Sequence, residues 1–130
     1  MEPTATRETN FLNVDLDLTF GIDIELMVRE LGDRVMTLNR TESFASFELA
    51  TKLPGPGSTD EAIAGFAELV RGLSPQARAL WDGCTRRTMN VGVDGPAERP
   101  PITFSVSRES IGALVDLGAD LSFTVYGPAA

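Results

Sequence analysis

Three polar side chains near the N-terminus have the types and the spacing to bind a ligand. Asn13, Asp15 and Asp17 alternate with apolar residues, so we expect them on one face of a β-strand, with the two carboxylates about 6.6 Å apart. Their oxygens suit a hard divalent cation, and Asp94 on a second strand of similar sequence would join them if the two strands were neighbours. The spacing is not that of a calcium-binding loop. A small-ligand or divalent-metal site is therefore our alternative interpretation, behind a protein-binding face.

Other catalytic patterns are missing from the sequence. The chain has no histidine to serve as a general base, and its single cysteine, Cys84, lies on an apolar helical stripe where we expect it to be buried. The sequence contains no nucleophile elbow, phosphate-binding lysine motif or glycine-rich dinucleotide loop. Arg86 and Arg87 follow a predicted helix, whose C-terminal carbonyls they would complement. We therefore expect a protein that is not an enzyme and that uses no cofactor or metal.

The charge balance narrows the choice of partners. The chain has 130 residues and a net charge of -8, from 19 acidic and 11 basic residues. Nucleic acids and anionic membranes are bound through Lys and Arg, so this excess disfavours both and favours a basic protein partner. Residues 1–9 are polar and of mixed charge, which predicts a disordered tail and no signal peptide. With no apolar run of about 20 residues, we expect a cytoplasmic location.

We expect residues 10–130 to form a single domain around one core. Alternating apolar residues predict strands at 11–18, 35–38, 44–49, 89–94, 102–106 and 121–126. Helical spacing and capping residues predict helices at 22–31, 58–73, 74–84 and 107–117, with Gly32 and Gly118 as left-handed C-caps. This order predicts an α+β, two-layer sandwich, in which a mixed sheet of five or six strands carries the helices on one face. Ferredoxin-like halves are one arrangement, and right-handed crossovers would make the first two and the last two strands parallel.

The same patterns predict which side chains are buried and which form an open sheet face. The expected core is Leu12, Val14, Leu16, Ile63, Phe66, Leu80, Trp81, Val91, Phe104, Leu114, Phe123 and Val125, with Ile111 and Val115 also facing inward. The expected open face is Asn13, Asp15, Asp17, Thr37, Asn39, Ser46, Asn90, Gly92, Asp94, Thr103, Ser105, Ser122, Thr124 and Tyr126. Short side chains suit docking because they lose little entropy. We take Asn13, Asp15, Asp17, Asn90, Asp94, Thr124 and Tyr126 as binding residues. We expect the partner to be a protein, and a second copy of the chain is one candidate. The alternative is that the face only contacts solvent.

The C-terminal residues are also similar to a known group of proteins. The residues concerned are Leu117-Gly118-Ala119-Asp120-Leu121-Ser122-Phe123-Thr124-Val125-Tyr126. Together with the order of elements and the opening alternating strand, this segment resembles an uncharacterised family of small bacterial cytoplasmic α+β domains. Domains of that family end in a helix, a Leu-Gly-Ala turn and an alternating strand that closes on Tyr. Some occur beside toxin genes as candidate immunity proteins. The resemblance implies a non-enzymatic immunity or accessory protein.

Overall fold

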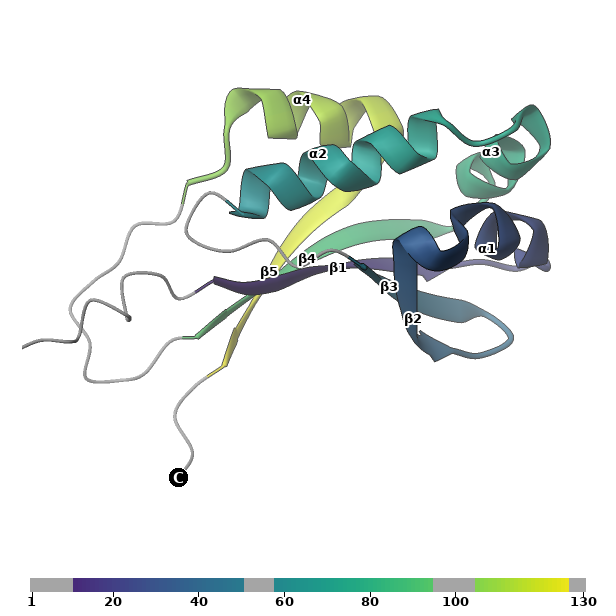
Figure 1. The fold of residues 1–130 in the computed structure, drawn as a ribbon, viewed down its shortest axis with the longest axis horizontal. Coiled ribbons are helices and arrows are strands. Elements are labelled where there is room, and N and C mark those ends of the chain that lie inside the picture. The colour runs from purple at the N-terminus through teal and green to yellow at the C-terminus, as the bar shows by residue number, and fades with distance from the viewer. Residues whose placement is uncertain (1–10, 51–57, 95–104, 127–130) are drawn as a thin grey trace, which may run out of the picture.

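The computed structural model describes residues 11–50, 58–94 and 105–126, apart from the side chains of residues 11, 12, 58 and 94 (Figure 1). Its elements are β1 (Phe11–Thr19), α1 (Glu25–Leu31), the 3-10 turn η2 (Gly32–Arg34), β2 (Val35–Arg40), β3 (Phe44–Leu49), α2 (Ser58–Arg71), α3 (Pro75–Asp82), β4 (Arg86–Asp94), α4 (Arg108–Leu117) and β5 (Asp120–Tyr126). The predicted elements therefore form, except that the tail at 1–9 and most of the strand at 102–106 fall outside the described residues. Ser105 and Val106 are described and belong to no strand.

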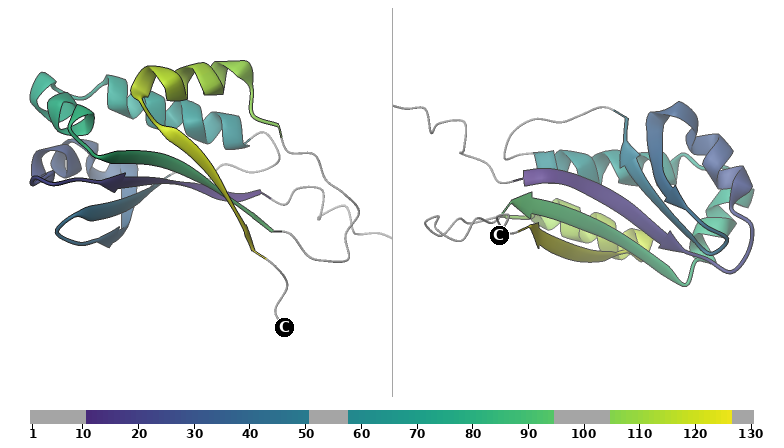
Figure 2. Two further views of the ribbon diagram at one scale, coloured as in Figure 1. Left: turned by 180° about the vertical axis from the view of Figure 1, so that it is seen from behind. Right: turned by 90° about the horizontal axis from the view of Figure 1, so that it is seen from below.

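The five described strands form one mixed sheet in the order β2-β3-β1-β4-β5. β1 is central and antiparallel to both β3 and β4, whereas β4 and β5 are parallel. β1 and β2 run in the same direction, as predicted, with β3 between them. The helices lie on one side of the sheet (Figures 1 and 2). This confirms the predicted two-layer α+β sandwich with a mixed sheet.

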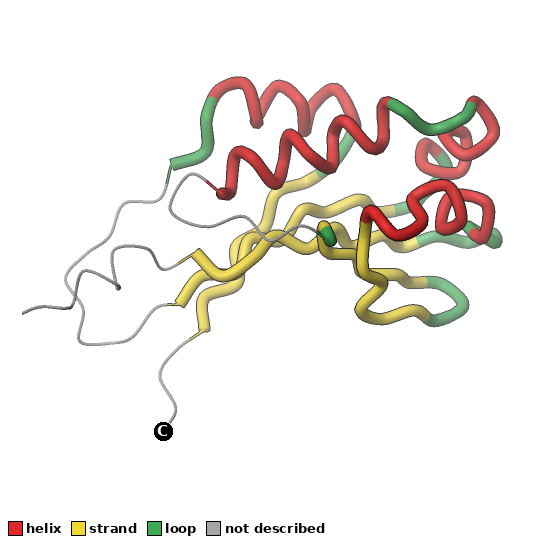
Figure 3. Tube along the Cα trace, viewed as in Figure 1, coloured by secondary structure: helices red, strands yellow, loops and turns green. Residues whose placement is uncertain are grey.

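The ferredoxin-like prediction holds for one part of the chain. The succession β1-α1-β2-β3-α2-β4 with the strand order β4-β1-β3-β2 is the split βαβ arrangement, with α3 inserted before β4. The chain then adds a single parallel unit, α4–β5, beyond β4 (Figure 3). The structure therefore contains one ferredoxin-like unit with an extension rather than two similar halves.

The core lies between the helices and the sheet. Of the predicted core, Val14, Leu16, Ile63, Phe66, Trp81, Val91 and Leu114 are buried, and Leu80 is half-buried against them. Leu12 and Phe104 are not among the described side chains. The prediction is wrong for Phe123 and Val125 of β5, which are 46% and 63% exposed, and for Ile111 and Val115 of α4, which are 50% and 76% exposed. All four belong to the unit at the rim of the sheet, where no further described element covers them.

Trp81 and Arg87 close the end of the core where α3 and α4 finish. The Trp81 side chain is fully buried, and its indole Nε1 donates to the carbonyl oxygen of Leu117 at 3.0 Å. The Arg87 guanidinium lies 5.9 Å from the Trp81 ring centroid and donates to the carbonyl oxygens of Trp81, Cys84 and Gly118. This confirms that Arg87 complements helix C-termini, whereas Arg86 is exposed on the other side of the strand. Cys84 is buried as expected, and burial raises the pKa of its thiol.

Two pairs of neighbouring helices, α1 with α3 and α2 with α4, are each joined by a carboxylate that binds the first turn of the partner helix. Glu30 of α1 accepts hydrogen bonds from the backbone N–H and the hydroxyl of Ser74, the N-cap of α3. Asp60 of α2 accepts from the backbone N–H of Ser107, the N-cap of α4, at 3.0 Å and from the hydroxyl of Ser110 at 2.7 Å. These bonds hold the pKa of both carboxyls below their usual range. The helix layer is thus fixed by two similar contacts.

Replacing Asp60 with Asn is expected to lower the free energy of unfolding by about 1 kcal/mol at pH 7, because hydrogen bonds to a charged acceptor are stronger than those to a neutral one. The lowered pKa means that the contribution is present above the unfolded-state pKa and is lost as the pH falls through the folded-state pKa. Urea denaturation at neutral and strongly acidic pH would measure this, with the exposed neighbour Glu61→Gln as control. An equal loss at both pH values would contradict it.

Candidate functional site

The central strand presents its polar side chains on the sheet face opposite the helices. Asn13, Asp15 and Asp17 are each half-buried on this open face, because Val14 and Leu16 between them point into the core. The predicted alternation is therefore confirmed. β1 has a strand on either side, so these three side chains lie in the middle of the face rather than at its rim.

The pairing of β1 with β3 brings a third carboxylate to this position. In the antiparallel register Glu48 lies opposite Asp15 and Ser46 lies opposite Asp17, and opposed residues share a face. The Ser46 hydroxyl donates to Asp17 Oδ1 at 2.7 Å. The Asn13 amide donates to Asp15 Oδ1 at 3.2 Å and to Glu48 Oε2 at 3.3 Å. We refer to Asp15, Asp17 and Glu48 as the acidic cluster.

Electrostatic repulsion in the acidic cluster is not balanced by a nearby cation of the described chain. The salt bridges formed among the described residues all involve other carboxylates. Burial, followed by the charges of Glu48 and Asp17, raises the pKa of Asp15 from 3.8 to about 6. At neutral pH the cluster therefore carries its negative charge at a cost in free energy.

The other predicted binding residues lie on the β4 and β5 side of the same face. Asn90 is opposite Asp15 and accepts a hydrogen bond from the Thr124 hydroxyl at 2.9 Å. Gly92 allows two side chains to approach the backbone, because a Cβ there would lie 2.6 Å from Asn13 Oδ1 and 3.3 Å from the Tyr126 ring. The structure thus gathers Asn13, Asp15, Asp17, Asn90, Thr124 and Tyr126 on one continuous face.

The register places Asp94 far from the acidic cluster. β1 and β4 are neighbours, as the metal-binding alternative required, but Asp94 lies four residues beyond Asn90, the residue opposite Asp15. This separation is about 13 Å along the strand. The Asp94 side chain is outside the described part. Among the side chains that are described, no group of three His, Cys, Asp or Glu residues could hold a metal ion.

The prediction of the open face is wrong for Thr37 and for Ser105, which is described and belongs to no strand. Thr37 pairs with the buried Phe47 and so lies on the helix side, whereas Met36 pairs with Glu48 on the open face. A bulge after Thr37 then returns Asn39 to the open face as predicted. Sequence reasoning missed Glu48, although its place two residues after Ser46 was sufficient to find it. Thr103 lies outside the described residues.

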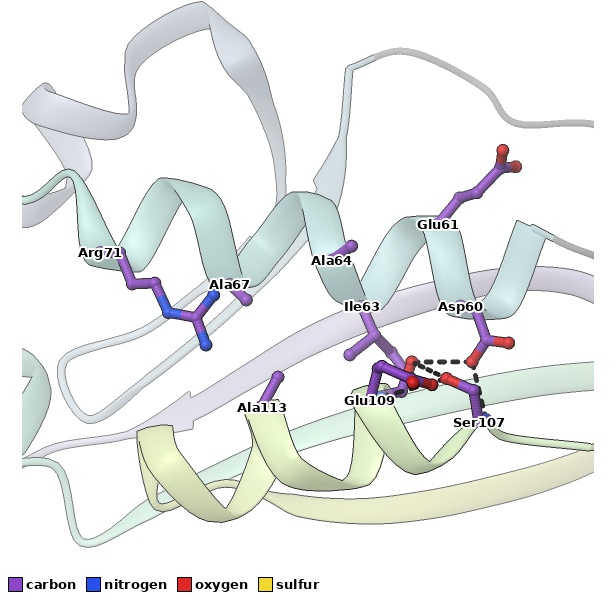
Figure 4. A pocket seen from close by; sticks show the side chains of 10 residues that line it. Asp60, Glu61, Ile63, Ala64, Ala67, Arg71, Ser107, Glu109 and Ala113 are labelled. Carbon is purple, nitrogen blue, oxygen red and sulfur yellow. Dashed lines mark hydrogen bonds between the residues drawn. The ribbon is translucent and has the colours of Figure 1, made fainter.

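A pocket of about 380 Å³ lies on the opposite side of the molecule, between α2 and α4 (Figure 4). The residues that line it include Ala64, Ala67 and Ala113, and Arg71 lies toward one end. At the other end, Asp60 is already engaged with the first turn of α4. Asp60 at one end and Arg71, which forms an ion pair with Asp116 of α4, at the other thus join the two helices, and the open face is the better candidate for function.

Comparison of the chain with protein-family models, curated proteins and solved structures found no match. Within the described residues, no helix combines the length and the apolar character needed to cross a bilayer. The class of protein that fold and site define is an extended ferredoxin-like α+β domain with an acidic sheet face that no described helix covers.

Proposed function

We propose that this chain is a non-enzymatic interaction module of the cytoplasm that binds a basic protein partner through its open sheet face. The observation that carries the proposal is the acidic cluster, in which Asp15, Asp17 and Glu48 are held together without a described cation. A Lys or Arg of a partner would relieve the repulsion that raises the pKa of Asp15. An immunity or accessory role, which the C-terminal resemblance implies, is one setting for such an acidic domain.

The surface around the cluster favours a protein over a small ligand. It extends across five strands, and hydrogen bonds such as Ser46 to Asp17 and Thr124 to Asn90 hold its side chains in place before binding. Less entropy is therefore lost on docking. Met36 and Tyr126, exposed toward opposite sides of the face, offer apolar contacts. The net charge of -8 would steer a basic partner toward it.

Replacing Asp15 and Asp17 together with Asn is expected to slow association with the partner about tenfold at low salt. The difference should shrink as salt rises and the Debye length falls below about 10 Å. The partner would be captured from lysate on the immobilised chain, and association would then be measured by stopped flow at two salt concentrations. Glu61→Gln with Glu68→Gln is the matched control, because it removes the same charge from exposed positions of α2 on the other side of the sheet.

An on-rate that falls equally in both double variants would mean that net charge alone steers the partner, and an unchanged on-rate would mean that the face is only solvated. Calorimetry with Ca²⁺, Mg²⁺ and Mn²⁺ tests the remaining alternative. Cation binding that disappears in Asp15→Asn would favour a divalent-metal site over a protein-binding face.

A further inference from the structure

The pocket between α2 and α4 exists because the two helices are joined at its ends and not along its middle. At one end Asp60 of α2 binds the first turn of α4, and at the other end Arg71 forms an ion pair with the last turn of α4. Between these contacts the lining side chains include Ala64, Ala67 and Ala113, which are too short to fill the space (Figure 4). The volume of about 380 Å³ is that of a small-molecule site. We refer to it as the α2–α4 pocket.

The two ends of the α2–α4 pocket carry opposite charges. The carboxylates of Asp60 and Glu109 line the end near the first turn of α4, and the Arg71 guanidinium lies toward the other end (Figure 4). Both hydrogen bonds that Asp60 accepts from α4 use Oδ1, which leaves Oδ2 for a ligand. Glu109 is exposed and forms no ion pair with another described residue. The pocket is therefore complementary to a molecule with a cation at one end and an anion at the other.

The distance between the charged ends limits the length of the ligand. Long helical side chains lean toward the N-terminus of their helix, and the Arg71 guanidinium accordingly lies beside Ala67 (Figure 4). Ala67 is seven residues from Asp60, which is about 10 Å along the helix axis. Ile63 and the alanine methyl groups line the space between the ends, so the part of the ligand that joins its two charges is apolar.

We propose that the α2–α4 pocket binds a zwitterion in which an aliphatic chain separates a primary ammonium group from a carboxylate by about 10 Å. The ammonium would donate to Asp60 Oδ2 and to Glu109, the chain would lie on the alanines, and the carboxylate would accept from Arg71. The contact of Arg71 with Asp116 is long, 3.7 Å, and joins side chains that are 54% and 76% exposed, so giving it up costs little. The pocket lies on the helix side of the sheet, so this ligand and the proposed protein partner occupy different surfaces.

Titration of the full chain with ω-aminooctanoate, whose extended length matches the separation of the charged ends, would test the proposal. Amide NMR spectra should show saturable shifts at Ala64, Ala67 and Ala113, which line the pocket. The expected dissociation constant is about 1 mM, because a ligand of this size in an open pocket gains little free energy per atom. Octanoate lacks the ammonium and octylamine lacks the carboxylate, so each should bind at least about fivefold more weakly.

Two variants separate the shape of the pocket from its charge. Ala64→Leu fills the space from an exposed position and should raise the dissociation constant of ω-aminooctanoate at least about tenfold, whereas Ala79→Leu, at an exposed alanine of α3 outside the pocket, is the matched control. Arg71→Gln should weaken ω-aminooctanoate to the affinity of octylamine and leave octylamine itself unchanged. Far-UV circular dichroism and the emission of buried Trp81 would confirm that each variant folds.

Three results would overturn the proposal: no saturable shift at about ten times the expected dissociation constant, equal binding of the three probes, or binding that Ala64→Leu weakens no more than the control does. The Asp15→Asn, Asp17→Asn double variant should bind ω-aminooctanoate like the wild type. Binding in the pocket and binding of a basic partner therefore succeed or fail separately.

Discussion

Replacing Trp81 with alanine is expected to lower the free energy of unfolding by about 4 kcal/mol, the largest effect we predict for one substitution. The side chain is fully buried between α3, α4 and the sheet, so its removal would leave a cavity. It would also remove the indole N–H that donates to the Leu117 carbonyl oxygen, and the aromatic ring that the Arg87 guanidinium faces. The loss therefore combines lost burial with an unpaired polar group.

Urea denaturation followed by circular dichroism would measure this change, because the variant has lost the tryptophan fluorophore. Trp81→Phe serves as the comparison, since it keeps much of the ring volume and loses the indole donor. We expect it to cost about 1–2 kcal/mol. A loss below about 1 kcal/mol in the alanine variant would contradict the burial of this side chain.

Replacing Asp15 with Asn is expected to raise the free energy of unfolding at pH 7.5 by about 1 kcal/mol. The raised pKa, about 6 against 3.8, means that folding favours the protonated acid and that ionisation above pH 6 destabilises the fold. The full shift corresponds to about 3 kcal/mol, but the side chain is partly exposed and solvent screens its repulsion, so the smaller value is expected. Asn keeps the shape and removes the charge.

The same pKa shift predicts how the free energy of unfolding of the wild type changes with pH. In the wild type the folded state binds more protons than the unfolded state between about pH 4 and pH 6, so stability should fall as the pH rises through this window. In Asp15→Asn that fall should be absent, and the two proteins should be equally stable near pH 4. Urea denaturation at several pH values, followed by Trp81 emission, would measure it. Glu68→Gln is the control, and wild-type and Asp15→Asn profiles that run parallel would contradict the prediction.

A cluster that weakens the isolated fold is consistent with a binding role. Asp15 and Glu48 lie opposite each other on neighbouring strands, where like charges oppose folding. A basic side chain bound between them would turn this repulsion into attraction. When the cluster is neutralised, the free energy of unfolding should therefore rise and the affinity for the partner should fall. A binding site is expected to show this trade-off between stability and function.

The sequence by itself determined the local structure and which side chains of the central strand lie on its polar face. The alternation of residues 11–18 predicts β1 and its polar face, because side chains of a strand point alternately to its two sides. Ser74 and Ser107 predict the starts of α3 and α4, and Gly118 is the left-handed C-cap predicted for α4, with φ 70° and ψ 34°. These features depend on residues near in sequence, so a local pattern is sufficient for them. The C-cap prediction is wrong for Gly32, whose φ of 56° is combined with a ψ of -137°, outside the left-handed helical region, and which begins the 3-10 turn η2.

The candidate site was only partly predictable, because it combines strands that are distant in sequence. The face of β1 follows from its own residues. Its pairing with β3, which places Glu48 opposite Asp15, and with β4, which keeps Asp94 away, depends on the strand order. The raised pKa of Asp15 follows from that pairing, since burial and the Glu48 charge are its two largest causes.

Tertiary structure also decided which apolar faces are buried. Met89, Val91 and Val93 of β4 and Leu121, Phe123 and Val125 of β5 alternate in the same way, yet the first set is buried and Phe123 and Val125 are exposed. The pattern shows that one side of each strand is apolar but not whether another element covers that side. β4 lies inside the sheet beneath the helices and β5 lies at its rim, and that placement depends on contacts across the whole chain.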